Sequence, residues 1–481
     1  MANVKAWKYH DAAQPAFPDD FEIAQKAVLQ VTDIKTNRNK YYAIELHVAG
    51  ERFRVFTHYG RTDDLEANPD SGQKECRYAD SLFEAQAIYQ SIYNQKTGSR
   101  KGYQEIALAA SNIGSRKARG TSSGAVDDKT LEKLAEKEKQ DGQPAKKPVV
   151  KQSALPSAVQ ALVRYIYDEA TNALTSTVQA KITANGIETP LGILTIGQIE
   201  KGEDILGELY DVFQKKRVKH KADRLEQLSS AFYTAIPHRF GRTRAAAAAA
   251  VINSLADFEQ KQNTLQLMKD MLQVNGEEGN VLFDAQVDEE YNALNCTVEP
   301  VEAASGEFKE LRDFVEKSQI KTKSVQVKSI FKVHRDAETA VFRNDVGNQR
   351  PLFHGSRIQN WVGLLSRGIL LPKIVVSMGV HRTDAGWLGH GIYFGDAACT
   401  SCFYTTPGRR KTRLMAICNV ALGKAKQYKK ITYGLTAPPD GYDSCHGVRR
   451  KFARPSEFDD DEYVVYDTSQ QHMKYLVEFA A

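Results

Sequence analysis

Apolar and polar residues alternate along the N-terminal part of the chain in the way that half-buried strands require. The alternation runs through residues 46–48 and 52–56, and Gly50 between them suits a turn, so this segment predicts a β-hairpin. Further strand-like runs and one helical stretch stand on either side, at residues 27–34, 39–46 and 81–95. We expect a small sheet with one helix over residues 1–112.

The spacing of apolar residues becomes helical after residue 153. Four stretches show it, at residues 155–166, 195–209, 225–232 and 245–272. Thr195 and Gln198 stand where a capping box would begin the second helix. The alanine run 245–250 belongs in the fourth helix because alanine is the best helix former. Successive amphipathic helices predict an all-α bundle over residues 153–318.

Two other changes in composition complete the division of the chain. Residues 113–152 are poor in apolar side chains and predict a flexible linker. From residue 319 short strand-like runs return between Gly-rich loops, and no long helix follows each run as a parallel arrangement would require. We therefore expect an α+β domain with a mainly antiparallel split sheet over residues 319–481, and a multidomain α+β chain as a whole.

Composition narrows the class of protein. Hydrophobic residues make up 42% and charged residues 26% of the chain, which excludes a wholly disordered or fibrous protein. The six cysteines are too scattered for a secreted disulfide scaffold. The first residues contain no apolar signal segment, and no stretch approaches the ~18 apolar residues of a membrane span. These features predict a soluble intracellular protein that does not cross a membrane.

Two motifs suggest chemistry that their context does not support. Residues 389–395 read GHGIYFG, but this glycine spacing is wrong for the dinucleotide fingerprint and no parallel βαβ unit is expected here. Cys399 and Cys402 form a CxxC pair without the second pair that a zinc site needs. We expect neither a Rossmann nucleotide site nor a bound metal.

Basic residues gather in the predicted hairpin region. Residues 30–61 contain six Lys or Arg side chains against three acidic ones, with aromatic side chains such as Tyr41 and Tyr42 between them. Basic groups would bind phosphates, and an aromatic ring could stack on the exposed base of a DNA end. On charge alone, a solvated sheet face explains the pattern equally well, because the net charge of the whole chain is only +5.

A family resemblance is carried by three segments of the last third, LFHGSRIQN at 352–360, GHGIYFGDAACTSCFY at 389–404 and DDDEYVVYD at 459–467. They resemble the catalytic domain of the poly(ADP-ribose) polymerases, the diphtheria-toxin-like ADP-ribosyltransferases. That family carries a His-Tyr-Glu signature in this order, and the matching residues are His354, Tyr393 and Glu462. Each residue alone has an ordinary structural explanation. A purely structural explanation of all three would require three coincidences at once, because all three stand at the signature positions.

The resemblance continues towards the N-terminus. Residues 42–62 are similar to the WGR module, with a tyrosine where the family usually has tryptophan. Residues 188–206 and 228–241 resemble the helical regulatory domain of DNA-dependent members, and the catalytic segments are closest to the vault-associated branch. The resemblance implies binding of DNA strand breaks. From it and from the charge pattern we select as DNA-binding residues Tyr59, Gly60, Arg61, Arg38 and Lys40.

The resemblance also implies NAD+ as the substrate, with acceptor proteins and the enzyme itself as partners. Nicotinamide leaves the ribose as a neutral base, so its departure needs no general acid and a single carboxylate can suffice, unlike the pair in glycosidases. Glu462 would stabilise the positive charge that develops on the ribose. His354 would bind a ribose hydroxyl, and Ser356 would help at the adenosine side.

The nicotinamide end of NAD+ is assigned to four residues by the same resemblance. The backbone of Gly355 and the hydroxyl of Ser401 would hold the carboxamide. The rings of Tyr393 and Tyr404 would sandwich the pyridine ring, for which planar aromatics have the right shape. Leu370 stands where an arginine often lines the adenosine site, so that contact is not carried over.

These features together predict a DNA-damage-responsive, NAD+-dependent protein poly-ADP-ribosyltransferase. Thr400 stands where many polymerising members have a lysine, so transfer of a single ADP-ribose stays open. A catalytically silent scaffold that binds DNA ends is the alternative from another class. The helical domain is expected to limit NAD+ access until DNA binds. The protein would act in the nucleus of a eukaryote, or in the cytoplasm and nucleoid of a bacterium.

Overall fold

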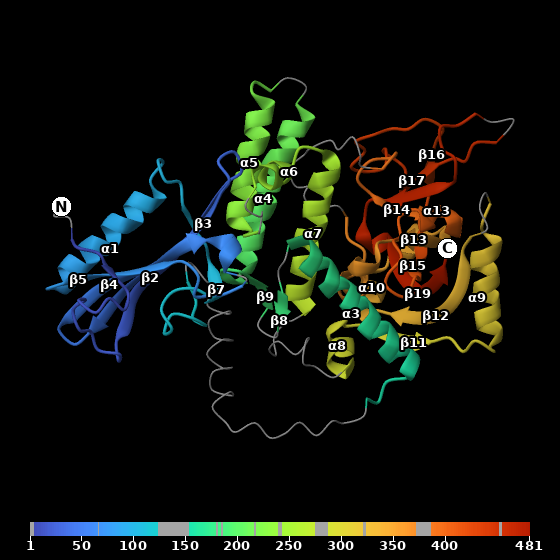
Figure 1. Ribbon diagram of the computed structural model, residues 1–481. Coiled ribbons are helices and arrows are strands. Elements are labelled where there is room, and N and C mark those ends of the chain that lie inside the picture. Colours follow the sequence, from blue (N-terminus) through green and yellow to red (C-terminus); the bar gives the residue numbers. More distant parts are fainter. Residues whose placement is uncertain are drawn as a thin grey trace. The chain divides into compact units, whose positions relative to one another are not determined.

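The structure is a computed structural model, and it describes residues 4–65, 67–123, 153–178, 181–183, 186–215, 218–238, 243–274, 287–320, 324–371, 386–451 and 455–481. The chain divides into two compact units (Figure 1). The first unit comprises Met1–Val149, Leu174–Leu272 and Glu277–Asn280. The second comprises Val150–Ala173, Gln273–Gly276 and Val281–Ala481.

The first unit begins with a six-stranded antiparallel sheet in the order β1-β5-β4-β3-β2-β6. Its strands are β1 (Trp7–Lys8), β2 (Glu22–Asp33), β3 (Arg38–Ala49), β4 (Arg52–Arg61), β5 (Gln73–Ala79) and β6 (Gln104–Glu105). The predicted hairpin is β3–β4, with Gly50 at a φ of 60° in its turn, a conformation that glycine adopts without strain. The expected sheet is therefore confirmed.

Helix α1 (Leu82–Thr97) covers one face of this sheet (Figure 1). It begins at Ser81, whose side chain accepts a hydrogen bond from the amide of Glu84, as an N-cap does. Ala85 and Ile88 from the helix are buried against apolar residues of β2 and β3, and this cluster is the core of the module. The helix predicted over residues 81–95 is confirmed.

The segment from residue 113 to 123, predicted as the start of a flexible linker, is packed against the sheet instead. The amide and the hydroxyl of Ser115 donate to the buried carboxylate of Glu45 at 2.7 and 2.5 Å. Gly114 has a φ of 104°, and a Cβ there would lie 2.2 Å from Glu45 Oε1, so only glycine fits. A buried acceptor on β3 thus fixes a polar segment that has little apolar surface of its own. The rest of the predicted linker, 124–152, lies outside the described residues.

A second, four-stranded sheet joins the module to the helical part of the same unit. Its order is β7-β10-β9-β8, with β7 (Leu108–Ser111), β8 (Lys181–Thr183), β9 (Gly186–Thr189) and β10 (Gly192–Leu194). Strand β7 pairs antiparallel with β10. The boundary expected near residue 112 therefore runs through one continuous sheet.

The helices α4 (Ile196–Gln214), α5 (Lys221–Ala235), α6 (Arg244–Ala249) and α7 (Leu255–Val274) follow. Thr195 caps α4 by accepting from the Gln198 amide, as expected, but the Gln198 side chain donates to the carbonyl of Ala235 on α5 instead of closing a capping box. The single helix expected over 245–272 is two helices. The break falls before Ser254, where Ser254 and Asp257 bond reciprocally and start a new helix.

The second unit is built on a nine-stranded sheet in the order β11-β12-β19-β15-β13-β14-β18-β17-β16. Its strands are β11 (Thr297–Pro300), β12 (Gln326–His334), β13 (Gln349–Gly355), β14 (Ile392–Gly395), β15 (Arg413–Ala421), β16 (Ala425–Tyr428), β17 (Ser444–Gly447), β18 (Glu462–Val465) and β19 (Gln471–Ala480). Every described pairing in it is antiparallel except that of β16 with β17. The mainly antiparallel sheet is confirmed.

This unit takes in elements that the sequence assigned to the helical domain. Strand β11 pairs with β12, and helix α9 (Gly306–Lys317) buries Phe308 and Val315 in the core of the sheet (Figure 1). Helix α3 (Ser157–Val178) begins here, and its Tyr165 hydroxyl donates to the carbonyl of Thr412 at 3.1 Å. The short helices α8 (Val287–Ala293), α10 (Asp336–Val341), α11 (Trp361–Arg367) and α13 (Ala398–Cys402) complete it.

Candidate functional site

The nine-stranded sheet brings the three signature residues onto neighbouring strands. His354 lies near the end of β13, Tyr393 lies on β14, and Glu462 is the first residue of β18. Strand β14 is the neighbour of both other strands, with Phe353 opposite Gly395 and Gly395 opposite Glu462. Segments far apart in the sequence thus meet at one edge of the strands.

Hydrogen bonds fix the first two residues. Nδ1 of His354 lies 3.0 Å from the carbonyl oxygen of Tyr393, and because a carbonyl only accepts, Nδ1 carries the proton. Burial lowers the pKa of His354, so the ring is neutral and its Nε2 is an acceptor. The Tyr393 hydroxyl donates to the carbonyl of Gly389 at 2.7 Å and accepts from the amide of Leu388 at 2.9 Å. Burial raises the pKa of Tyr393, which keeps the phenol neutral.

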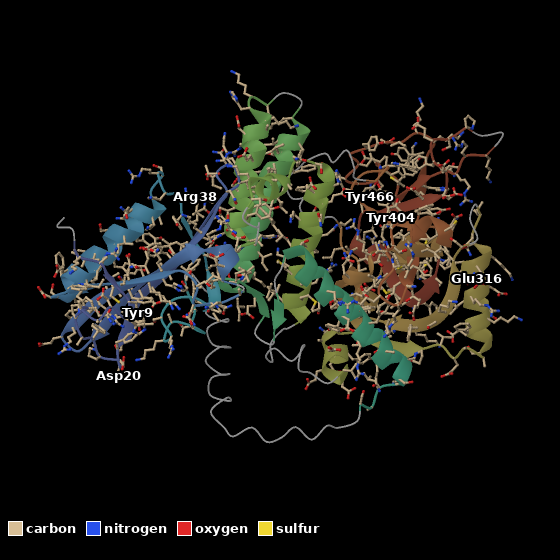
Figure 2. The ribbon with its side chains drawn as sticks, viewed as in Figure 1. Tyr9, Asp20, Arg38, Glu316, Tyr404 and Tyr466 are labelled. Carbon is tan, nitrogen blue, oxygen red and sulfur yellow. The ribbon has the colours of Figure 1, made fainter. Side chains whose placement is uncertain are left out.

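Helix α13 closes tightly over the end of β13. A Cβ on Gly355 would lie 2.0 Å from the carbonyl oxygen of Ser401, so only glycine allows this approach. The buried Ser401 hydroxyl donates to the carbonyl of Phe353 at 3.0 Å, and its oxygen keeps lone pairs that can accept from an amide. Tyr404 follows the helix and is 59% exposed (Figure 2). Ser356 accepts from the side-chain amide of Asn360 at 3.1 Å.

Glu462 has the electrostatics of a functional carboxylate. Burial raises its pKa to about 7, and the nearby carboxylate of Asp460 adds to the effect. In turn the charge of Glu462 raises the pKa of Tyr393, behind the larger effect of that ring's own burial. Glu462 and Tyr393 lie on the neighbouring strands β18 and β14. A buried carboxylate that titrates near neutral pH is typical of functional sites.

Sequence reasoning missed the cluster that holds the acidic run next to Glu462. The guanidinium of Arg449 lies 2.7 Å from Asp396, 3.4 Å from Asp461 and 3.6 Å from Asp460. The hydroxyl of the buried Thr400 donates to Asp460 at 2.8 Å. Arg449 therefore offsets the charges of its neighbours, while Glu462 takes part in no described ion pair. The only sequence signal was a pair of arginines shortly before a run of three aspartates.

The five residues selected for DNA binding all line one cavity of about 510 Å³ on the six-stranded sheet. Arg38 and Lys40 come from β3, and Tyr59, Gly60 and Arg61 from β4. The other lining residues include basic and aromatic side chains that the sequence reasoning did not select: Tyr42, Gly72, Gln73, Lys96, Arg100, Lys101 and Tyr103. Among all the residues that line this cavity, the five selected ones included, six are Lys or Arg, and no described lining residue is acidic.

The packing of this cavity separates structural from ligand-facing roles. The ring of Tyr59 stacks on Tyr42 with centroids 5.0 Å apart, so one of its faces is already covered. The guanidinium of Arg61 donates to the carbonyl of Asn37 at 3.1 Å and to Asp63 at 2.9 Å, which gives it a part in holding the sheet.

Lys96 reaches the cavity from α1, with its Nζ 4.0 Å from the centroid of the Tyr42 ring. Burial, together with the smaller effect of nearby cations such as Lys101 and Lys40, lowers its pKa to about 8. Crowded cations of this kind are stabilised by an anion.

Among the described residues no helix is long and apolar enough to cross a bilayer. His, Cys, Asp and Glu side chains do not gather there in a group that could hold a metal ion.

Comparison with known proteins identifies all three parts of the chain. A sequence model of the WGR domain matches residues 25–109, one of the poly(ADP-ribose) polymerase regulatory domain matches residues 153–278, and one of the poly(ADP-ribose) polymerase catalytic domain matches residues 305–458. The matches follow the order expected from the sequence. The catalytic match begins before residue 319, in agreement with the place of α9 in the second unit.

The curated relatives differ in how much of them this chain spans. The human protein mono-ADP-ribosyltransferase PARP4 is 37% identical over 338 residues, which are 69% of this chain and 18% of that protein. Poly [ADP-ribose] polymerase 1 of Caenorhabditis elegans is 27% identical over 501 residues, 94% of this chain and 48% of that protein. Human poly [ADP-ribose] polymerase 2 is 26% identical over 500 residues, 94% of this chain and 78% of that protein. With these three domains in this order and a His-Tyr-Glu set gathered on adjacent strands, the chain belongs to the poly(ADP-ribose) polymerase family.

Proposed function

We propose that this protein is an NAD+-dependent ADP-ribosyltransferase that modifies proteins, itself included, and that broken DNA stimulates it. The observation that carries the proposal is the position of Glu462, a half-buried carboxylate with a pKa of about 7 on the strand next to that of Tyr393. A silent scaffold would have no use for a carboxylate held in this state, because its burial destabilises the fold at neutral pH.

The proposed reaction breaks the bond between the nicotinamide nitrogen and C1′ of the ribose. The bonding electrons leave with nicotinamide, which departs as a neutral base, and positive charge develops on the sugar. Glu462 accepts a hydrogen bond from the 2′-hydroxyl and stabilises that charge. A nucleophilic group of the acceptor then forms the new bond to C1′. Its proton passes to Glu462, whose pKa of about 7 suits general-base work at neutral pH.

The surrounding residues fit the binding roles proposed for them. The close approach of Gly355 to α13 leaves room for a flat carboxamide, with the Ser401 oxygen as a hydrogen-bond acceptor. Hydrogen bonds hold Tyr393 in place, so its ring suits a fixed stacking surface for one face of the pyridine ring. Tyr404 is exposed, so its ring suits the opposite face, which it would cover once NAD+ is bound. His354 offers a neutral Nε2 to a ribose hydroxyl, and Ser356 stands next to it in the chain for the adenosine side.

Stimulation by DNA strand breaks is proposed from the basic cavity on the six-stranded sheet. Its Lys and Arg residues suit phosphates, and Tyr103 and Tyr42 provide aromatic surface at the same place. The helical part is proposed to limit NAD+ access until DNA binds, so DNA must favour the open state. Such a protein would work inside the cell, in the nucleus of a eukaryote or at the nucleoid of a bacterium.

Two products are compatible with this proposal, a chain of ADP-ribose units or a single unit. Chains of ADP-ribose follow from the resemblance to polymerising members. Transfer of a single unit is favoured by Thr400, which stands in place of a lysine and bonds to a buried aspartate, so that no cation comes from this position. Relatives of this chain include three that are named protein mono-ADP-ribosyltransferases and five that are named poly [ADP-ribose] polymerases.

Incubation of the purified chain with labelled NAD+, with and without nicked duplex, tests these points together. We expect label on the protein, with strong stimulation by the duplex. A ladder on a gel indicates chains, and one discrete band indicates single transfer. Label that does not exceed that of a Glu462→Gln variant would refute the transferase proposal. Equal labelling with and without duplex at low salt would refute stimulation by DNA alone.

A further inference from the structure

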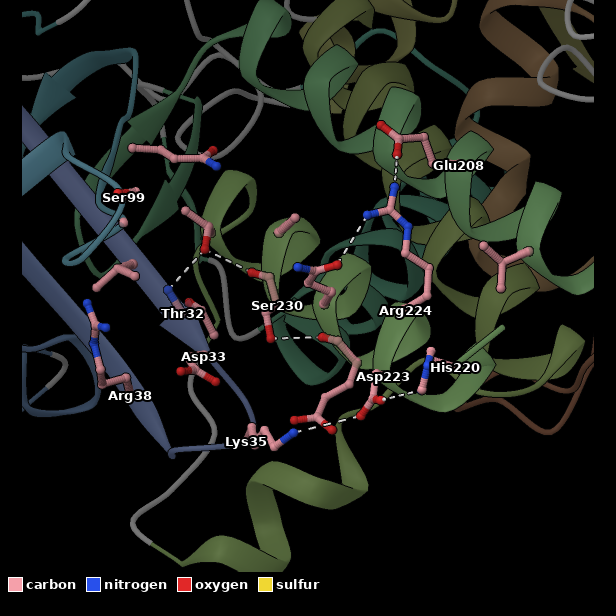
Figure 3. Close-up of a pocket in the computed structure, with 18 of the residues that line it drawn as sticks. Thr32, Asp33, Lys35, Arg38, Ser99, Glu208, His220, Asp223, Arg224 and Ser230 are labelled. Atoms are coloured by element: carbon pink, nitrogen blue, oxygen red, sulfur yellow. Dashed lines mark hydrogen bonds and ion pairs between the residues drawn. The ribbon is translucent and has the colours of Figure 1, made fainter. Parts of the chain in front are cut away.

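A second and larger cavity, of about 1040 Å³, lies in the first unit where the six-stranded sheet meets helices α4 and α5 (Figure 3). Hydrogen bonds between backbone amides of the sheet and side chains of α5 hold its two walls together. The amide of Thr32 donates to Thr234 Oγ1 at 2.9 Å, and the amide of Ile34 donates to Ser230 Oγ at 3.1 Å. The sheet and α5 therefore form a fixed frame around the cavity.

This cavity shares a basic wall with the cavity proposed to bind DNA. Arg38, Arg100 and Lys101 line both. Figure 3 shows Arg38 on the sheet side, across the cavity from the helices. Lys215 and Lys219 line the second cavity from the end of α4 and from the connection to α5, and both are exposed. In the sequence, residues 215–221 read KKRVKHK.

Acidic side chains also line the second cavity, and most are occupied by other partners. Glu208 pairs with Arg224 at 2.9 Å, and Asp223 lies 3.7 Å from both Lys35 and His220 (Figure 3). Asp33 accepts from the hydroxyl of Thr36, and Asp211 and Glu226 are the remaining acids of the lining.

The cations of the shared wall and of the α4–α5 connection are different. Five of these cations lie more than 4.0 Å from every carboxylate among the described residues. They are Arg38, Arg100, Lys101, Lys215 and Lys219. Arg38 donates to the carbonyl of Lys101, but its charge, like that of the other four side chains, is not offset by a described carboxylate, so all five can attract an outside anion.

We propose that the two cavities form one phosphate-binding track, along which duplex DNA held on the sheet continues onto the α4–α5 connection. Lys215 and Lys219 would contact its backbone there. The inference rests on the DNA binding proposed above and adds direct contact by the helical part. A row of cations spread over two cavities suits a polyanion better than a single phosphate, because duplex DNA carries a charge every ~1.7 Å of its axis.

The consequence concerns where DNA acts on the protein. If the track is occupied, the phosphate backbone bridges β3 and the end of α4 directly. Contacts with the helical part, and not only contacts with the sheet, then contribute to the binding free energy. A differential contact of this kind is what a ligand needs in order to shift a conformational equilibrium.

Salt-dependent binding of the full chain to a nicked duplex, measured by fluorescence anisotropy, tests the track. We would compare the wild type with the double variant Lys215→Gln, Lys219→Gln. Each lost phosphate contact lowers the slope of log affinity against log salt by ~0.9. Between 0.05 and 0.2 M salt the wild type should therefore lose affinity about tenfold more than the variant does. The matched control is Lys201→Gln, Arg244→Gln, which removes two exposed cations of the same unit that line neither cavity.

The outcomes separate this inference from the proposal beneath it. A wild type that does not bind duplex at 0.05 M salt refutes both. Wild-type binding that is weakened by Lys40→Gln, but follows an unchanged slope in the double variant, refutes the track and leaves DNA binding by the sheet standing. An unchanged slope in the double variant is also the result expected if the basic sequence 215–221 serves only as a targeting signal.

A second measurement does not depend on the variants. DNA should protect Lys215 and Lys219 of the wild type from acetylation, read by mass spectrometry, while Lys201 stays reactive. Full reactivity of Lys215 and Lys219 on the duplex would overturn the proposal.

Discussion

Replacement of Glu462 by glutamine should make the protein inactive and, at the same time, more stable at alkaline pH. The substitution keeps the shape of the side chain and removes only its charge. In the wild type, burial raises the pKa of this carboxyl from 4.5 to about 7. The folded state therefore binds the proton more tightly than the unfolded state does.

The sign of the pH effect follows from this shift. The contribution of Glu462 to stability is most favourable below pH 4.5, and it is lost as the pH rises through about 7. Each unit of difference in pKa corresponds to ~1.4 kcal/mol, so the loss is ~3.5 kcal/mol at most. A glutamine is neutral at every pH and avoids this loss. At pH 8 the variant should therefore unfold several degrees above the wild type, and at pH 4 the two should be nearly equal.

Activity should follow the opposite course. With a pKa of about 7, roughly a tenth of Glu462 is ionised at pH 6 and nine tenths at pH 8, so wild-type transfer should rise about tenfold over this range. The variant should transfer ADP-ribose at least ~10²-fold more slowly at pH 8, because an amide does not offset developing positive charge. NAD+ binding should survive, since the lost interaction belongs chiefly to the transition state.

The assay pairs thermal unfolding from pH 4 to 8 with transfer of labelled ADP-ribose over pH 6 to 8. Asp459→Asn is the matched control, because it makes the same chemical change at an exposed position that pairs with Arg450. A Glu462→Gln variant that keeps activity within tenfold of the wild type would remove the carboxylate from the mechanism. A variant that is less stable than the wild type at pH 8 would refute the claim that partial burial of the ionised Glu462 carboxylate destabilises the folded state.

Three further predictions concern the same unit. Gly355→Ala should lower NAD+ affinity at least tenfold and destabilise the protein by ~1–3 kcal/mol, because the added Cβ would lie 2.0 Å from a carbonyl oxygen of α13; calorimetric titration that gives wild-type affinity would contradict the close approach. Tyr404→Ala should weaken binding of a benzamide-type nicotinamide mimic about tenfold through loss of ring stacking, and an unchanged dissociation constant would exclude the sandwich. A fragment that begins at residue 296 should unfold at a higher temperature than one that begins at residue 319, because it keeps β11 and the buried face of α9; equal melting temperatures would show that the boundary lies where the sequence pattern put it.

Local features were predictable from sequence because their causes are local. The β3–β4 hairpin needs only strand alternation around Gly50, and the start of α4 needs only a Thr195 side chain that reaches the third amide along. For the hairpin and the cap the information lies within a few positions of the chain. The signature residues His354 and Glu462 were identified instead by a family resemblance that rests on three widely spaced segments taken together.

Other features depended on partners far away in the chain. Residues 113–123 were assigned to a linker because they are polar, but the buried Glu45 on β3 supplies the acceptors that fix them. Strand β11 was missed because it is short and acquires its burial only by pairing with β12. Periodicity reports the faces of a single element and is silent on which distant element covers them.

The candidate sites divide in the same way. The sequence by itself determined the residue types: a histidine, a tyrosine and a glutamate at signature positions, and cations such as Arg38 beside aromatics on a sheet. Only the tertiary structure decided that Glu462 is half-buried near Asp460 with its pKa raised to about 7, and that Lys96 joins the basic cavity from a helix. The physical reason is that pKa and charge density depend on distance and burial in space, which long-range pairing of strands sets and local sequence does not.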